Sequence, residues 1–390
     1  MSSGNPFEGF GFLGDLARML QQQGPVSWSA AAQIAVSIAT EGQSEPNVDP
    51  QLRMELEELG RVAELQVEGA IGLSPAVTGR AVRILPVNRS QWVQRSLDAY
   101  RPVLEDLAAS LAPPPDETED QAAADPEAWL GQLMSAMGPM MLGLTTGSMI
   151  GHLARRSFGQ YDLPVPRPPD DELVIVPANI ESFVEEWSLP ADGVRLWVCI
   201  HEMASHCVLN VRHVRERLQS LLKAYAGGFD QTGAGLEHRL EDLDPTSLDS
   251  AEDLQRFLSD PEVLLGAIES PAQRELRPSI DALVAAVVGV VDHVVDDVGG
   301  RLISSCGMVT EAVRRRRVTE DSATRFVERL LGLELSQATY DRGLAFADGV
   351  VERAGPEGLE RLWKAERNLP TPAEVDAPGL WLARIELPED

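Results

Sequence analysis

The residues most capable of chemistry lie in the segment HEMASH, where His201 and Glu202 precede Ser205 and His206. In the related pattern H-E-x-x-H, two histidines four residues apart on one helix face bind zinc, and the glutamate takes a proton from metal-bound water. Here the fifth position is Ser205. On a regular helix His206 is rotated from His201 by about 140°. We therefore expect the two histidines to face different sides.

Other arrangements of this segment stay open on spacing alone. A π-bulge could bring His201 and His206 together. Glu202 and His206 are four residues apart and could hold a surface ion, although an intrahelical pair is the simpler interpretation. Cys199 and Cys207 lie close enough to the histidines for a Cys–His nucleophile pair, although apolar-flanked helical cysteines more often belong to the core. The pattern also arises by chance in long helices.

The elements that must position these residues are mostly helices, because the apolar spacing is predominantly helical. We predict a mainly α fold, α+β at most, with one strand at Leu173–Val176. The predicted organisation is a helical region at 1–112, an acidic proline-rich loop at 113–128, and a helical domain at 129–390. That domain carries the HExxH-derived helix (194–210) and a second motif helix (271–298). Further helices are predicted at 7–22, 29–39, 50–71, 91–111, 129–158, 180–187, 321–333, 336–354 and 356–366.

Charge and composition narrow the class of partner. The formal net charge of −28 over 390 residues would repel nucleic acid and anionic membranes. The densest basic run, Arg314–Arg317, is expected to be a solvated helix face. No stretch reaches the ~18 uninterrupted apolar residues of a membrane span, and no signal peptide is visible. With three cysteines and no disulfide framework, we expect a cytoplasmic protein. No nucleophile elbow, Walker loop or dinucleotide fingerprint is present.

Four segments in order carry a resemblance to a known family. They are FGQYDLPVP at 158–166, the stretch around HEMASH at 196–218, VGVVDHVVD at 288–296, and the C-terminal part at 329–384. Together they resemble a family of zincin-like hydrolases, known mostly from actinobacteria and often labelled zinc-dependent metalloproteases. Some relatives are labelled as associated with deazaflavin-cofactor biosynthesis. The resemblance covers roughly residues 25–385 and implies a zincin-like metallopeptidase fold.

The resemblance also assigns roles by position. His201 matches the first zinc ligand and Glu202 the general base. Ser205 stands where the second zinc histidine belongs, and Val288 stands where the family has a glutamate that we take as the third ligand. Two of three protein ligands are thus replaced. The resemblance implies a degraded metal site in a pseudoenzyme without a resident cofactor, retained as a scaffold for an unknown protein or peptide.

Two alternatives accompany this interpretation. Asp292 lies one turn beyond Val288 and could join His201 and water in a compensated zinc site, which would leave an active hydrolase with an unusual ligand set. Asp292 and His293 also occur in the family pattern, so a supporting role for Asp292 is the expected one. The other alternative is a purely structural helical protein whose motif similarity is accidental.

Overall fold

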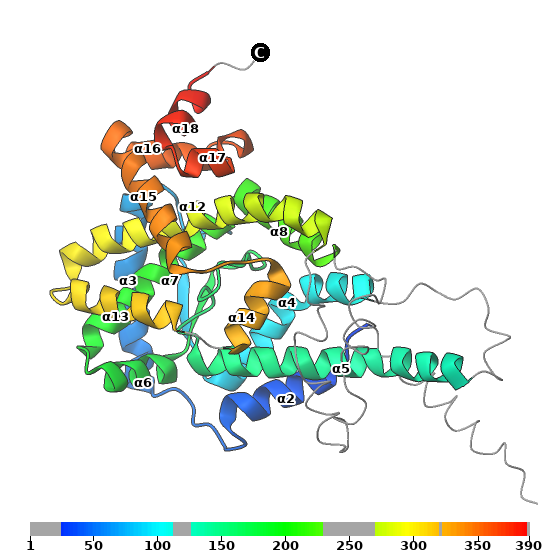
Figure 1. Cartoon of the computed structure of the whole chain (residues 1–390). Coiled ribbons are helices and arrows are strands. Elements are labelled where there is room, and N and C mark those ends of the chain that lie inside the picture. Colours follow the sequence, from blue (N-terminus) through cyan, green and yellow to red (C-terminus); the bar gives the residue numbers. More distant parts are fainter. Residues whose placement is uncertain (1–24, 112–125, 229–269, 320–321, 388–390) are drawn as a thin grey trace, which may run out of the picture.

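The computed structural model describes residues 25–111, 126–228, 270–319 and 322–387, and helices dominate them (Figure 1). The described strands are β1 (Arg83–Pro86) and β2 (Glu172–Ile175). They pair in parallel, with Leu85 opposite Val174. The mainly α fold class is confirmed, and the predicted strand lies within one residue of β2. The sequence prediction missed β1, because only Ile84 and Leu85 are apolar strand formers between Arg83 and Pro86.

The described helices include nearly all of those predicted from the sequence. The predicted helix at 7–22 and most of the loop at 113–128 lie outside the described residues, and α5 already begins at Pro126. The single helix predicted at 356–366 is wrong, because that stretch divides into α16 and 3₁₀ turns at Arg361–Trp363 and Glu366–Asn368. The described α-helices are α2 (Trp28–Thr40), α3 (Pro50–Ile71), α4 (Arg89–Leu111), α5 (Pro126–Arg156), α6 (Pro177–Trp187), α7 (Ala191–Asn210), α8 (Arg212–Ala226), α12 (Pro271–Leu302), α13 (Cys306–Val318), α14 (Ser322–Leu331), α15 (Gln337–Ala354), α16 (Glu357–Glu360), α17 (Pro372–Val375) and α18 (Pro378–Ile385).

The helix α7, which carries HEMASH, is a core helix. It is buried almost without interruption from Trp197 to Leu209 and packs against α3 and α12. A helix that is apolar on nearly all sides is stable only inside a protein, which explains why its few polar residues must find partners there. The extended backbone of Val211 separates α7 from α8.

The long helix α12 lies beside α7. A capping box begins the helix: the backbone N–H of Gln273 donates to the side chain of Ser270, and the backbone N–H of Ser270 donates to the side chain of Gln273. By length and composition α12 could cross a membrane, but 78% of its most apolar window is buried, as in a core helix. It crosses α15 where a Cβ atom added to Gly289 would lie 2.0 Å from the backbone of Gly343. Only glycine permits this close approach.

The helices share one continuous apolar core that runs from α2 to α18. In Figure 1 α2 and α5 lie at one end of the molecule and α16–α18 at the other, with α7 and α12 between them. The division at 113–128 stays a prediction. The central position of α7 and α12 means that their facing side chains enclose a buried volume, into which α13, α14 and α15 also project residues.

Candidate functional site

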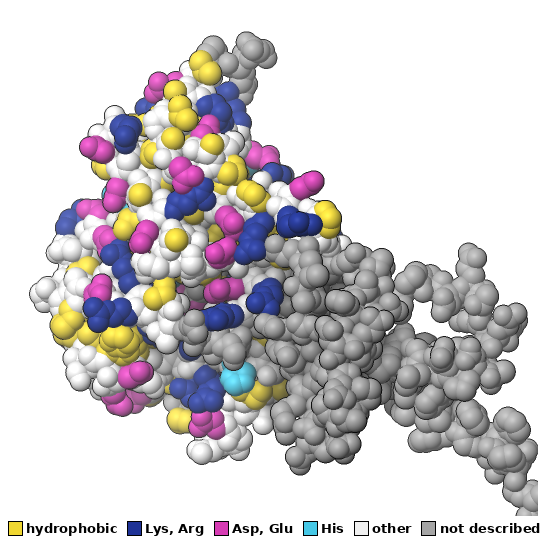
Figure 2. Space-filling model, in the orientation of Figure 1, with side chains coloured by type: hydrophobic (Ala, Val, Ile, Leu, Met, Phe, Trp, Pro, Cys, Tyr) yellow, Lys and Arg dark blue, Asp and Glu magenta, His cyan; other side chains and the backbone are white. Residues whose placement is uncertain are grey.

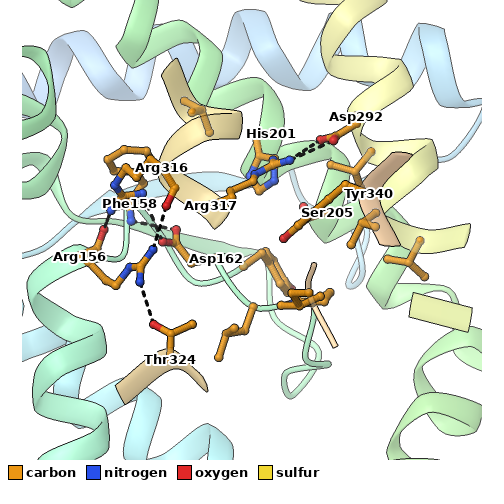
Figure 3. A pocket seen from close by; sticks show the side chains of 18 of the residues that line it. Arg156, Phe158, Asp162, His201, Ser205, Asp292, Arg316, Arg317, Thr324 and Tyr340 are labelled. Atoms are coloured by element: carbon orange, nitrogen blue, oxygen red, sulfur yellow. Dashed lines mark hydrogen bonds and ion pairs between the residues drawn. The ribbon is translucent and has the colours of Figure 1, made fainter. Parts of the chain in front are cut away.

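A cavity of about 60 Å³ lies between α7, α12 and α13 (Figure 3). His201 and Ser205 line it from α7, and Val288 and Asp292 line it from α12. The structure thus brings together four of the five residues singled out from the sequence, although α7 and α12 are some eighty residues apart in the chain. The fifth, Glu202, does not line the cavity.

His201 presents its ring to the cavity from a stacked position. The ring lies parallel to that of Trp197, with centroids 5.2 Å apart and an interplanar angle of 7°. Its Nδ1 atom is 3.6 Å from Glu202 Oε1, and the side chain is 14% exposed. Nε2 has no hydrogen-bonding partner among the described residues. Among the metal-binding atom types of the H-E-x-x-H pattern, this nitrogen is the one that faces the cavity.

Glu202 is turned toward the loop that follows α5. Its Oε2 accepts hydrogen bonds from the backbone N–H groups of Gln160 and Tyr161, at 2.9 and 3.0 Å. The side chain is 1% exposed. A Cβ atom at Gly159 would lie 2.5 Å from Oε2, so glycine is required for this approach. Burial raises the pKa of Glu202, although His201 and the Tyr161 N–H oppose the shift. Its contacts are those of a structural link.

His206 lies on a different side of α7 from His201. Its Nδ1 is 3.2 Å from the hydroxyl of Tyr161 and 3.1 Å from Nδ2 of Asn210. Burial lowers the pKa of His206 to about 4, so the ring is neutral at pH 7. The interpretation of His206 and Glu202 as an intrahelical pair or surface ion site is wrong, because both are 1% exposed and bond other residues.

Asp292 is held by an arginine from α13. Both of its carboxylate oxygens accept from Nη1 of Arg317, at 2.8 and 3.0 Å. The guanidinium carbon lies 5.7 Å from the ring centroid of Trp197 and 4.9 Å from that of Tyr340. Burial alone would lower the pKa of Arg317, but Asp292 more than offsets this and the pKa is raised. A charged guanidinium, paired with Asp292, therefore stands at this end of the cavity.

The expectation that Arg314–Arg317 form a solvated face is wrong for half of the run. Arg314 and Arg315 do point outward and pair with Asp296 and Glu311. Arg316 and Arg317 point into the cavity, with side chains 17% and 14% exposed. Successive helical residues are about 100° apart, so four in a row cannot share one face.

A second charged group lines the opposite end of the cavity in Figure 3. The guanidinium of Arg316 lies 3.9 Å above the ring of Phe158, with Nη1 3.9 Å from Asp162 Oδ2, and it also donates to the backbone carbonyl of Arg156. Arg156 in turn donates to Thr324 Oγ1 at 2.9 Å. Burial lowers the pKa of Arg316 to about 10, which still leaves it charged at neutral pH.

The side chains present do not fit a zinc ion of the zincin type. Ser205 has only a hydroxyl group and Val288 has no ligand atom, whereas zinc prefers nitrogen, thiolate or carboxylate ligands. Asp292 is engaged by Arg317 through both oxygens. Within the described ranges no three His, Cys, Asp or Glu side chains are grouped closely enough to hold a metal. Among the five sequence-predicted residues, His201 alone presents to the cavity a zinc ligand of the preferred kind that is not already paired.

The two cysteines of α7 do not form a nucleophilic site. Cys199 and Cys207 are 0% and 2% exposed, and burial raises the pKa of both thiols. A reactive cysteine needs the opposite, a lowered pKa and access for a substrate. They are core residues, as the apolar flanks of both positions predicted.

Comparison with known proteins identifies the family of this mainly helical fold. Residues 26–382 match the family model described as zincin-like metallopeptidase, so the chain belongs to this family. A crystal structure of a candidate hydrolase with a novel fold from Chloroflexus aurantiacus has the same fold, with a TM-score of 0.60. The two sequences are 21% identical, and the match covers 93% of this chain and all of the other. No curated protein matches significantly.

Arg317 and its neighbour Arg316 are the residues that sequence reasoning missed. A signal was present, because Val309 and Val313 mark the buried face of α13. Arg316 and Arg317 follow Val313 by three and four residues, which places them on that same face. Periodicity within α13 therefore predicts inward arginines, whereas the density of the basic run suggested a surface.

Proposed function

We propose that this chain is a zincin-like protein that has lost zinc binding and peptide hydrolysis and is retained as a binding scaffold. The observation that carries the proposal is the Asp292–Arg317 ion pair, which lies in the same cavity as Ser205 and Val288. In this interpretation the guanidinium supplies the positive charge that a metal ion would otherwise bring between α7 and α12.

Electrostatics support this reading. A cation fixed between Trp197 and Tyr340 repels a divalent ion, and the repulsion is strong where burial lowers the effective dielectric constant. Asp292 would have to release Arg317 to become a ligand, which would leave a buried guanidinium without its carboxylate. A compensated zinc site of His201, Asp292 and water would therefore require breaking the buried Asp292–Arg317 ion pair, which an ordinary zinc site does not require.

The cavity size argues against peptide hydrolysis at this site. A volume of about 60 Å³ accommodates a few water molecules, whereas sites for drug-sized ligands enclose about 300–1,000 Å³. A peptide bond with its flanking side chains does not fit in such a space. Glu202, the residue at the general-base position, bonds the loop backbone instead of facing the cavity.

The wider proposal is a cytoplasmic scaffold with a protein or peptide partner. The three cysteines are free thiols, which suits a reducing compartment. Figure 2 shows acidic and basic side chains interspersed over the face in view, where no broad basic patch stands out. Together with the net charge of −28 this argues against nucleic acid and anionic membranes as partners.

Zinc titration of designed variants tests the proposal. We compare the wild type, the double variant Ser205→His with Val288→Glu, and the triple variant that adds Arg317→Gln. Zinc affinity should rise in that order, because the double variant restores two donors and the triple variant also removes the competing cation. Saturable zinc binding by the wild type that is lost in His201→Ala would overturn the proposal.

A further inference from the structure

The cavity contains hydrogen-bonding groups that no protein atom satisfies. Arg317 uses only Nη1 to bind Asp292, which leaves its Nε and Nη2 groups without a partner. The hydroxyl groups of Ser205 and Tyr340 also have none. Unlike His206 Nε2 elsewhere on α7, these atoms are open to the space of the cavity, so a molecule that enters it can reach them. Because no protein atom uses these hydrogen-bonding groups, they are available to a ligand that displaces water from the cavity.

These groups come from three helices and meet at one end of the cavity. In Figure 3 Arg317, Ser205 and Tyr340 lie beside His201, on the side of the cavity away from Arg156 and Thr324. Burial raises the pKa of Tyr340 to about 12, so its hydroxyl keeps a proton to donate. The set offers a guanidinium edge and two hydroxyls, which is a donor-rich arrangement suited to an oxyanion.

We propose that this cavity binds a small monocarboxylate, whose carboxylate pairs with the free Nε–Nη2 edge of Arg317 and accepts from Ser205 and Tyr340. A guanidinium edge forms two parallel hydrogen bonds with a carboxylate. A singly charged carboxylate is favoured over the more highly charged phosphate, because Asp162, Asp292 and Glu328 also line the cavity. The inference rests on the proposed function, because a zinc ion beside His201 would take the carboxylate itself.

The acidic side chains in the cavity do not oppose such a ligand as strongly as their number suggests. Asp292 is neutralised by Arg317, and Asp162 lies near Arg316. Burial raises the pKa of Glu328, which favours its neutral form. The arginines therefore retain an attraction for an added anion.

The remaining lining sets the size and polarity of the ligand. Leu209 of α7 and Val287 and Val288 of α12 are apolar and also line the cavity. A volume of about 60 Å³ leaves room for only a few non-hydrogen atoms. A short aliphatic acid therefore fits both features, with its chain against the valines. Val288 stands where the family resemblance places a metal ligand, and in this proposal it contacts the aliphatic chain of the acid instead.

Isothermal titration of the full chain, shown by metal analysis to be zinc-free, tests the inference with acetate, propionate, butyrate and inorganic phosphate. We expect saturable one-to-one binding of a carboxylate. Ser205→Ala and Tyr340→Phe should each weaken it about tenfold, since each removes a hydrogen bond to a charged group. Arg317→Lys should also weaken it, because a lysine keeps the charge but lacks the planar fork.

The matched control is Arg315→Lys, two residues away on the exposed side of α13, which should leave binding unchanged. Thermal melting checks that each variant is folded. The inference is overturned if zinc-free protein binds no carboxylate, if phosphate binds in preference, or if Ser205→Ala and Tyr340→Phe both bind as the wild type does. Stoichiometric zinc in the protein as purified would instead overturn the proposed function, so the two failures are distinguishable.

Discussion

Removing the carboxylate of Asp292 should cost far more stability than removing that of Asp296, which forms a neighbouring ion pair between the same two helices. Asp292 and Asp296 are one turn apart on α12, and each pairs with an arginine of α13 at nearly the same distance, 2.8 and 2.7 Å. Their surroundings differ. The side chains of the first pair are 6% and 14% exposed, and those of the Asp296–Arg314 pair are 39% and 31% exposed.

This contrast sets the expected magnitudes. Asp292→Asn leaves the buried Arg317 without a counter-charge, and removing one partner of a buried pair costs about 3–5 kcal/mol. Because asparagine can still accept one hydrogen bond, we expect the lower end of that range. Asp296→Asn breaks an accessible pair, whose contribution is about 0–1 kcal/mol. The two variants should therefore differ by about 2 kcal/mol or more in free energy of unfolding.

Urea unfolding of both variants at neutral pH, followed by circular dichroism, measures this difference. The transition midpoint should fall clearly for Asp292→Asn and hardly at all for Asp296→Asn. If both variants lose the same stability, or if Asp292→Asn loses less than about 1 kcal/mol, the pair is not the buried charge anchor described here.

Three further outcomes follow from the core around α7 and α12. Because burial raises the pKa of Glu202, the wild type should lose stability as pH rises from about 4.3 through the raised pKa of the folded state. Urea unfolding at pH 5 and 8 measures this loss, which Glu202→Gln should remove. Burial lowers the pKa of His206 to about 4, so the neutral ring should contribute stability that is fully present above pH ~6.5. The free energy of unfolding should fall by about 3 kcal/mol as the pH drops through 4, and an unchanged acid sensitivity in His206→Gln would contradict this. Gly289→Ala should destabilise the protein by more than about 3 kcal/mol, because the new Cβ would meet the backbone of Gly343 at 2.0 Å. Gly300→Ala on the same helix meets open space and should stabilise the protein slightly, and thermal melting compares the two variants.

The sequence predicts the helices of this fold well because their apolar residues recur at helical intervals. It also predicts that His201 and Ser205 share one face of α7, which follows from the angle between successive helical residues. That Val288 lies in the same cavity was expected only through the family resemblance. Nothing in the spacing of α12 itself distinguishes Val288 from the apolar residues around it.

The rest of the site depends on tertiary contacts that no local pattern encodes. Glu202 bonds a loop some forty residues earlier in the chain, so its withdrawal from the cavity was not foreseeable from HEMASH. The partner of Asp292 lies on a helix twenty-five residues further on. The periodicity of α13 could have predicted that Arg317 points inward, but a dense run of basic residues usually indicates an exposed helix face.

The metal content of the protein purified without chelators tests the central claim most directly. With Ser205 and Val288 at two ligand positions and Arg317 bound to Asp292, elemental analysis should find zinc far below one equivalent per chain. One equivalent of zinc that disappears in His201→Ala would contradict the account. It would mean that a working metal site had formed from a ligand set other than the one inferred here.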